Sequence, residues 1–229
     1  MTINNICETI LRSPSSQNKM MNSGETATNI TLLYGRPGFG KTTLLLQIAH
    51  EIAKSGEVLF LSLEHNEETI NYRLQRMNML SKNIVIDDNS HINIENVQKL
   101  IDRHKNTKLI IVDYLGLSEG MDHLLKLYET IRIPILVSAQ ILVSAQIGGL
   151  TTYTDSIYQL LRQEMINPTI LKEIKKLCIN RILKCNGDTG TAQTYDISND
   201  TSVEEYDANG LVRTYKLIWD SDIGQFVDV

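Results

Sequence analysis

An eight-residue segment, Gly35 to Thr42, has the residue types and spacing of a phosphate-binding loop. It reads GRPGFGKT and fits the pattern GxxxxGK[ST]. In such a loop the glycines let successive backbone N–H groups point at phosphate oxygens, the lysine reaches the outer phosphates, and the hydroxyl binds Mg²⁺. We therefore expect Lys41 to contact the nucleotide phosphates and Thr42 to be a ligand of Mg²⁺.

The whole loop is expected to surround the nucleotide, because backbone N–H groups at a helix N-terminus bind phosphate whatever the side chains are. The residues expected to bind the cofactor are Gly35, Arg36, Pro37, Gly38, Phe39, Gly40, Lys41, Thr42, Thr43 and Asp113.

Two acidic residues follow apolar runs that we expect to be strands. Val58 to Leu63 is followed by Glu64, and Leu109 to Val112 is followed by Asp113. In an open parallel sheet the chemistry gathers at the carboxyl ends of strands, so Glu64 is placed to polarise a water molecule facing the γ-phosphate. Alternatively, Glu64 simply begins the next helix. Asp113 has the Walker B pattern, in which a buried strand delivers one carboxylate to the Mg²⁺ shell.

These residues require strands and helices that alternate along the chain. We expect strands near 30–35, 57–63, 84–86, 108–113, 134–140 and 155–160, and helices near 41–55, 67–80, 93–105 and 119–131. Such alternation predicts a parallel sheet with helices on both faces. After about residue 177 the pattern becomes β-hairpins, with expected two-residue turns at Asn186-Gly187 and Asn209-Gly210 and a polar acidic loop at 198–209.

The segments GRPGFGKTT, FLSLE and LIIVDYLGL together resemble the ATPase domain of the RecA superfamily. The DnaB-type replicative helicases are the nearest branch, because SLE and a Walker B segment containing DYL recur there. The approach GETATNITLLYG also resembles archaeal recombinase-like and KaiC-like members, and the C-terminal YKLIWDSDIGQFVDV resembles the final hairpin of DnaB-type domains. The expected fold class is therefore α/β: a RecA-like P-loop NTPase core with a mostly parallel sheet flanked by helices, and C-terminal β-hairpins.

The resemblance implies ATP and Mg²⁺ as cofactors, with Glu64 as the catalytic base and Asp113 as the Walker B carboxylate. It implies single-stranded nucleic acid as a partner, DNA rather than RNA, and a homo-oligomer in the form of a ring or filament. In this family a glutamine or histidine at a strand end senses the γ-phosphate.

A tandem repeat makes the sensor ambiguous, because ILVSAQ occurs as Ile135 to Gln140 and again as Ile141 to Gln146. Pro134 favours the first copy as the strand, since helices usually end before the residue preceding proline. We therefore expect Gln140 to be the sensor, with Gln146 as the rival. The shift of six residues is even, so either copy would present the same faces to its neighbours.

The sequence departs from the helicases where they place a basic finger that completes the neighbouring subunit's ATP site. The segment RILKCNGDTGT resembles that hairpin, but cysteine and asparagine stand where an arginine is expected. The substitutes to consider are Lys184, Arg181 and Arg213. The segment ILVSAQIGGLTTYT, where helicases have a DNA-binding loop, contains no Lys or Arg and cannot neutralise phosphate by itself.

Residues 1–28 are expected to form an N-terminal arm and residues 29–229 a RecA-like ATPase domain. Ile3, Ile6 and Ile10 have helical spacing, so the arm either tethers a neighbouring subunit or packs on its own domain. The net charge is −5, which argues against a generally basic surface but allows a local basic stripe. The absence of a signal-like N-terminus or a membrane-length apolar run predicts a cytoplasmic protein without membrane contact.

Two functions remain open. The first is an ATP-driven nucleic-acid motor or helicase-like ring in DNA replication or recombination. The second is a non-motor ATP switch, such as a recombination mediator or helicase accessory or loader protein, that assembles with ATP but turns over slowly. Glu64 and Asp113 favour the motor, whereas the missing finger and the loop without basic residues favour the switch. A small-molecule kinase is disfavoured by the position of Glu64 and by the late hairpins.

Overall fold

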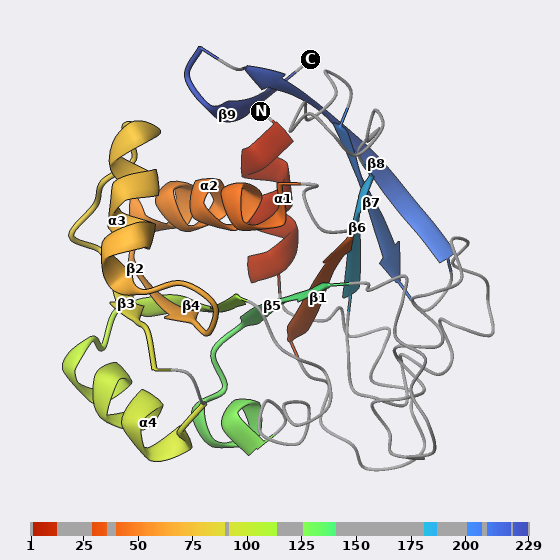
Figure 1. The fold of residues 1–229 in the computed structure, drawn as a ribbon. Coiled ribbons are helices and arrows are strands. Elements are labelled where there is room, and N and C mark those ends of the chain that lie inside the picture. Colours follow the sequence, from red (N-terminus) through yellow and green to blue (C-terminus); the bar gives the residue numbers. More distant parts are fainter. Residues whose placement is uncertain are drawn as a thin grey trace, which may run out of the picture.

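The fold is a sheet whose first part is parallel and whose last part is antiparallel (Figure 1). It was obtained as a computed structural model, which describes residues 2–12, 29–35, 40–89, 92–113, 126–140, 181–186, 201–207, 210–220 and 222–228. The strands are β1 (Ile30–Gly35), β2 (Glu57–Ser62), β3 (Ile84–Asp87), β4 (Thr107–Asp113), β5 (Ile135–Gln140), β6 (Arg181–Asn186), β7 (Thr201–Asp207), β8 (Gly210–Asp220) and β9 (Gln225–Asp228). The helices are α1 (Thr2–Leu11), α2 (Lys41–Ala53), α3 (Glu67–Arg76) and α4 (Ile94–Arg103), and residues 126–131 are also helical.

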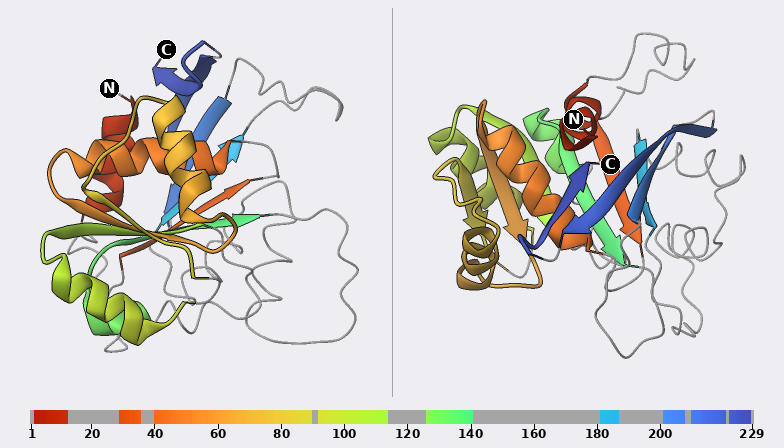
Figure 2. Two further views of the ribbon diagram at one scale, coloured as in Figure 1. Left: turned by 60° about the vertical axis from the view of Figure 1, so that its left-hand side comes forward. Right: turned by 90° about the horizontal axis from the view of Figure 1, so that it is seen from above.

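The strand order is β3-β2-β4-β5-β1-β6-β7-β8-β9. The strands from β3 to β6 in this order run parallel, and β6, β7, β8 and β9 pair antiparallel. Helices α1, α2 and α3 lie on one face of the parallel part and α4 lies on the other, as Figures 1 and 2 show. The predicted fold class, an α/β core with a mostly parallel sheet and C-terminal hairpins, is confirmed.

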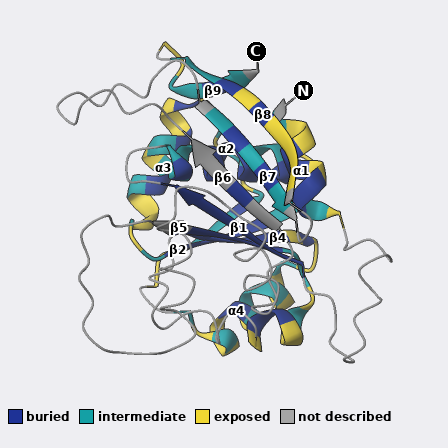
Figure 3. Cartoon of the chain, turned by 90° about the vertical axis from the view of Figure 1, so that its right-hand side faces the viewer, coloured by how far each residue is buried: buried dark blue, intermediate teal, exposed yellow. Residues whose placement is uncertain are grey.

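Two hydrophobic clusters sandwich the parallel strands, and alternate residues of each strand contribute to opposite clusters. On β1, Leu33 joins the cluster that includes α2, whereas Leu32 and Tyr34 join the cluster that includes α4. Every residue of β1 is buried, as expected for a strand with helices on both faces. Figure 3 shows β1 buried along its length, whereas β8 is partly exposed.

The strands predicted near 30–35, 57–63, 84–86, 108–113 and 134–140 and the helices predicted near 41–55, 67–80 and 93–105 are confirmed, with small shifts at their ends. Helix α3 ends at Arg76 instead of near residue 80, because Asn78 adopts a left-handed conformation (φ 54°) and the Met79 N–H closes the helix on Leu74 O at 2.8 Å. The expected helix at 119–131 is described only from residue 126, and Arg132 (φ 59°) ends it before Pro134. The expected strand at 155–160 lies outside the described residues.

The first copy of ILVSAQ is strand β5, as predicted. It lies between β1 and β4, and its residues Ile135 to Val137 pair with both neighbours. The second copy lies outside the described residues.

The prediction of an acidic loop at 198–209 is wrong, because Thr201–Asp207 forms strand β7. Val203 and Glu205 are buried while the residues between and beside them are half-buried, which is the period of a strand with one covered face. The sequence did not reveal this pattern, because a charged residue occupies one of the buried positions. The Glu205 carboxylate is accommodated there by accepting a hydrogen bond from the Tyr215 hydroxyl at 2.7 Å.

The predicted two-residue turn at Asn186-Gly187 is also wrong. Asn186 pairs with Ser202, so β6 and β7 are joined by residues 187–200. The hairpin between β7 and β8 is confirmed, but Asp207 pairs with Gly210, so its turn lies at residues 208–209, one position earlier than expected.

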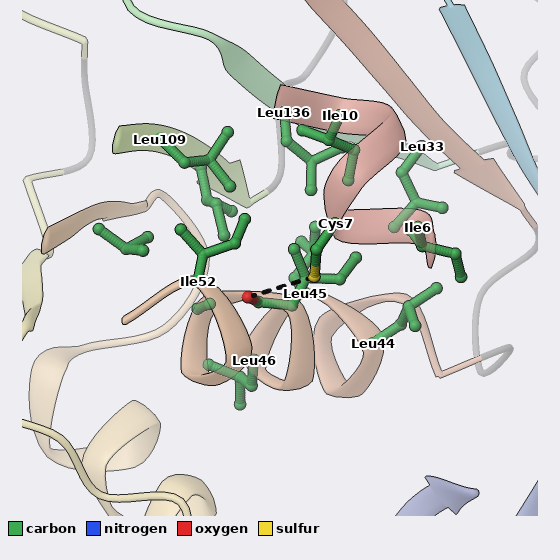
Figure 4. Packing of buried hydrophobic residues seen from close by; sticks show 14 of the residues in the cluster. Ile6, Cys7, Ile10, Leu33, Leu44, Leu45, Leu46, Ile52, Leu109 and Leu136 are labelled. Atoms are coloured by element: carbon green, nitrogen blue, oxygen red, sulfur yellow. Dashed lines mark hydrogen bonds between the residues drawn. The ribbon is translucent and has the colours of Figure 1, made fainter. Parts of the chain in front are cut away.

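Helix α1 packs on its own domain, which decides between the two interpretations of the N-terminal segment. Ile6 and Ile10 are fully buried in the cluster that includes α2 (Figure 4). The Cys7 thiol lies over α2 and donates to Ile48 O at 3.9 Å, and Thr9 Oγ1 lies 3.1 Å from the Tyr215 hydroxyl on β8. No helix among the described residues is both long and apolar enough to cross a membrane.

Candidate nucleotide site

The loop between β1 and α2 begins at Gly35, the last residue of β1, and leads into α2 at Lys41. Gly40 caps the helix in a left-handed conformation (φ 74°, ψ 18°). This conformation costs most other residues about 1–2 kcal/mol, so a glycine at this position lets the chain turn into the helix without strain. Residues Arg36 to Phe39 lie outside the described residues.

Lys41 is buried at the start of α2, and its ammonium group donates a hydrogen bond to Gly35 O at 2.9 Å. The side chain therefore reaches back to the end of β1. Thr42 and Thr43 follow on the first turn of α2 and are half-buried. A positive group and a helix N-terminus thus lie at the same place, which is the electrostatic setting that phosphate groups require.

The carboxyl ends of four parallel strands meet beside this loop. Gly35 at the end of β1 pairs with Gln140 at the end of β5, and Ser62 at the end of β2 pairs with Asp113 at the end of β4. Because β5 lies between β1 and β4, the loop and both strand-end acids share one edge of the sheet.

Strand alternation also places Asp113 on the face covered by α2. Leu109 and Ile111 belong to the cluster that includes α2, whereas Ile110 and Val112 belong to the opposite cluster. Asp113 continues the first series, so its carboxylate lies on the side of the sheet where Lys41 and Thr42 begin their helix.

The carboxylate of Asp113 is almost completely buried, with 2% of the residue exposed. Its Oδ1 accepts a hydrogen bond from the Ser138 hydroxyl at 2.6 Å. Within the described part of the chain, Oδ2 has no hydrogen-bond partner. A buried carboxylate oxygen without a donor is unfavourable unless a cation or a water molecule meets it, so this atom fits a Mg²⁺ ion or one of its water ligands.

Glu64 lies just beyond β2 and before α3, which begins at Glu67 behind the N-cap Asn66. The alternative that Glu64 begins the helix is therefore wrong. The Leu63 N–H donates to Asp113 O at 2.7 Å and ties this segment to the end of β4. The Glu64 side chain is 42% exposed, so its carboxylate is accessible to water.

A histidine and an arginine lie beside Glu64. His65 Nε2 is 4.0 Å from Glu64 Oε2 and 3.2 Å from Arg73 Nη2 on α3. The Ser62 hydroxyl fixes the turn by donating to His65 O at 2.6 Å. His65 lies in the turn between β2 and α3 and contacts Arg73 of α3. Among the described residues there is no group of three or more His, Cys, Asp or Glu side chains that could hold a metal ion.

The predicted γ-phosphate sensor and the candidate basic finger residues lie on strands β5, β6 and β8. Gln140 ends β5 opposite Gly35, whereas Gln146 lies outside the described residues. Arg181 and Lys184 are in β6, where Lys184 pairs with Tyr34 of β1 and with Glu204 of β7. Arg213 is exposed on β8, and its guanidinium lies 5.8 Å from the centre of the Tyr215 ring.

Ser138 is a polar contact of the site that the sequence did not reveal. It is fully buried and follows three apolar residues of β5, and a hydroxyl in such a position requires a partner. That signal was present in ILVSAQ, but the partner could not be identified before the pairing of β4 with β5 was known.

Comparisons with solved structures give the fold. The chain is similar to the ATPase domain of G40P, with a TM-score of 0.63 at 17% identity, covering 96% of this chain and 91% of that one. It is also similar to the RadB recombinase, with a TM-score of 0.55 at 17% identity, covering 94% and 97% of the two chains. The chain has the RecA-like NTPase fold. A DnaB-like replicative helicase is similar as well, with a TM-score of 0.63 and 17% identity over 96% of this chain and 62% of the helicase.

Sequence comparisons give one family model and several relatives that match part of the chain. The model of the family described as Novel STAND NTPase 5 matches residues 11–115, which include the phosphate loop and Asp113. The DNA repair protein RadA of Chlamydia muridarum is 35% identical over 85 residues, which are 37% of this chain and 18% of RadA. RadA of Aquifex aeolicus is 28% identical over 96 residues, 42% of this chain and 21% of RadA. The matches thus span about a fifth of each relative's length.

Proposed function

We propose that this RecA-like chain binds and hydrolyses ATP with Mg²⁺ and acts on nucleic acid as a helicase-like ring or motor. The observation that carries the proposal is the meeting of three groups at one sheet edge. These are the Lys41 ammonium bonded to Gly35 O, the Asp113 carboxylate with Oδ2 lacking a donor among the described residues, and the accessible Glu64 carboxylate.

In the proposed reaction Lys41 exchanges its bond to Gly35 O for the outer phosphates of ATP. Its charge, together with the backbone N–H groups at the start of α2, stabilises the negative charge of the transferring phosphoryl group. Glu64 accepts a hydrogen bond from the attacking water and orients it. The exposure of Glu64 is compatible with this role, because water must reach the carboxylate from solvent.

Thr42 and Asp113 would hold Mg²⁺, which when bound supplies charge neutralisation at the β- and γ-phosphates. Hydroxyl and carboxylate oxygens are the donors that this ion prefers in proteins. Gln140 is proposed to sense the γ-phosphate, since β5 ends beside Gly35 at the base of the loop.

The nucleotide part of the proposal is tested by measuring binding of a fluorescent ATP analogue and phosphate release for the wild-type chain and Lys41→Ala. We expect Lys41→Ala to weaken binding and abolish hydrolysis. The control is Lys54→Ala, which alters an exposed lysine paired with Glu51 near the other end of α2. Normal hydrolysis by Lys41→Ala would show that the site is wrongly assigned.

The nucleic-acid part is tested by the ATPase rate with and without single-stranded DNA or RNA. A motor should be stimulated several-fold, more by DNA than by RNA, and should form an oligomer detected by light scattering. Unchanged hydrolysis with both nucleic acids would contradict the motor while leaving the ATP site intact.

A second function, an ATP-dependent recombination mediator or helicase accessory protein with slow turnover, is favoured by one sequence feature. The segment RILKCNGDTGT has no arginine where the helicases carry a finger, and such a group contributes about 10³–10⁵ in kcat where it is present. The similarity to proteins named RadA and RadB is compatible with this role. ATP-dependent assembly with slow hydrolysis that nucleic acid does not stimulate would favour it.

A further inference from the structure

We propose that Ser138 is a positioning residue that directs a single oxygen of Asp113 toward the metal. This inference rests on the proposed nucleotide site and adds a residue that neither the phosphate loop nor the Walker B segment contains. Its basis is the 2.6 Å hydrogen bond from the Ser138 hydroxyl to Asp113 Oδ1.

The bond joins two adjacent parallel strands at their carboxyl ends. Val137 pairs with Val112, which places Ser138 and Asp113 in the next positions of β5 and β4. Leu136 and Ile111, two residues before each, both belong to the cluster that includes α2. Ser138 and Asp113 therefore approach each other on the face of the sheet where α2 begins.

Burial makes this bond specific. Ser138 is fully buried and Asp113 is 2% exposed, so bulk water does not compete for either group. A hydrogen bond to a charged acceptor in such surroundings is stronger than one between neutral groups. The bond therefore fixes the rotation of the carboxylate as well as the identity of the oxygen that receives the hydroxyl.

A second bond fixes the backbone of Asp113. The Leu63 N–H donates to Asp113 O, so both the main chain and the side chain of Asp113 are held from the flanking strands. With Oδ1 occupied, Oδ2 is the oxygen left to meet a cation or a cation-bound water, and it is the one without a partner in the described residues. Ser138 thus selects one oxygen of a carboxylate that could otherwise present either.

The role predicts a defect in metal binding with little defect in nucleotide binding. Partners that orient a metal ligand contribute about 10–100-fold to metal affinity. We expect Ser138→Ala to raise the Kd for Mn²⁺, used as a probe for Mg²⁺ in the presence of ADP, about 10-fold. The affinity for the nucleotide measured in EDTA should stay unchanged, because the Ser138 hydroxyl is bonded to Asp113 and acts through that carboxylate.

Three further variants complete the test, which uses the electron paramagnetic resonance signal of free Mn²⁺ and requires no turnover. Ser138→Thr keeps the hydroxyl and should bind Mn²⁺ within about 3-fold of wild type, whereas Ser138→Cys keeps the volume with a weak donor and should resemble Ser138→Ala. Thr31→Val is the matched control, because it removes a buried hydroxyl of β1 that has no partner among the described residues. If Ser138→Ala does not fold, the Thr and Cys variants carry the comparison.

The outcomes separate this inference from the proposed site. Wild-type Mn²⁺ affinity in Ser138→Ala and Ser138→Cys, with a large loss in Asp113→Asn, would overturn the positioning role and leave the site standing. Wild-type Mn²⁺ affinity in Asp113→Asn would instead overturn the metal assignment, and the role of Ser138 with it.

Discussion

The parallel half and the antiparallel half of the sheet use polar residues in different ways. In the parallel half, β1 is buried on both faces, and the polar groups of the site gather at the carboxyl ends of the strands, where Asp113 ends β4, Glu64 follows β2 and Lys41 bonds to the end of β1. In the antiparallel half, Glu205 is buried in the middle of β7, and its carboxylate receives the Tyr215 hydroxyl.

The polar residues of the parallel half are therefore placed to meet a ligand, whereas those of the antiparallel half connect elements of the fold. The acids at the strand ends are accessible to a ligand or have an oxygen available for one, whereas the polar network of Glu205, Tyr215 and Thr9 joins β7, β8 and α1. We therefore expect variants in the parallel half to change activity and variants in the antiparallel half to change stability.

The largest expected effect is on catalysis. Glu64→Gln removes the proposed base and should lower kcat by about 10²–10⁴-fold, the usual contribution of a general base. Nucleotide affinity and thermal stability should not change, because the side chain is exposed. The measurement is steady-state phosphate release beside binding of a fluorescent nucleotide.

The control for this prediction is Glu67→Gln, an exposed acid in the first turn of α3. It should hydrolyse ATP at the wild-type rate. Equal losses in both variants would mean that the general negative charge of this segment matters, and would contradict a specific base.

The next effect is on the packing of α1. Ile10→Ala empties a fully buried position between α1 and the core and should reduce the free energy of unfolding by about 2–5 kcal/mol. Urea unfolding followed by circular dichroism measures this change, with Asn5→Ala, exposed on the same helix, as the control. A loss below 0.5 kcal/mol would be expected only if α1 does not pack on its own domain in solution.

A smaller effect is expected from the polar network. Tyr215→Phe removes the hydroxyl that bonds to Glu205 and Thr9, and should cost about 1–3 kcal/mol of stability without changing ATP binding. Tyr72→Phe, at an exposed tyrosine of α3, is the matched control and should be neutral. A loss of nucleotide affinity in Tyr215→Phe would break the separation between the two halves.

The smallest effect is a pH dependence. Burial between α1 and α2, with a further contribution from the Glu51 charge, raises the pKa of the Cys7 thiol from 9.0 to about 12. The folded state therefore keeps a proton that the unfolded state loses, so the contribution of Cys7 is complete below pH 9 and is lost as the pH rises toward 12. Between pH 8 and pH 10 it should weaken by about 1 kcal/mol.

Urea unfolding at several pH values measures this slope in the wild type and in Cys7→Ala. The variant is expected to be less stable at pH 8 and to lose stability less steeply above it. Parallel slopes in the two proteins would contradict the burial of the thiol. Tyr206 and Tyr215, whose pKa values burial raises to about 12, contribute the same trend to both proteins.

Strands and helices were predicted correctly where neighbouring residues in the sequence themselves determine the local structure. The strands β1, β2 and β4 are runs of apolar residues, because strands buried on both faces need apolar side chains at every position. Gly40 marked the start of α2, because glycine adopts the left-handed conformation found there without strain.

Prediction failed where the cause lay in a distant segment. Strand β7 contains two glutamates, and the burial of Glu205 depends on a partner from another strand, the Tyr215 hydroxyl on β8. The helical spacing of α1 left open which surface would bury Ile6 and Ile10, because an amphipathic pattern identifies a face and not its partner.

The sequence by itself therefore determined the phosphate loop, the strand-end acids and the alternation that builds a parallel sheet, since these follow from local sterics and continuous hydrophobicity. The tertiary structure decided which partners those groups meet. The doubled ILVSAQ combines both cases, because either copy could form a strand, and pairing with β1 and β4 places Ile135–Gln140 in the sheet. The Ser138 bond to Asp113 exists only once those strands are adjacent, because hydrogen bonds between strands depend on register and not on sequence distance.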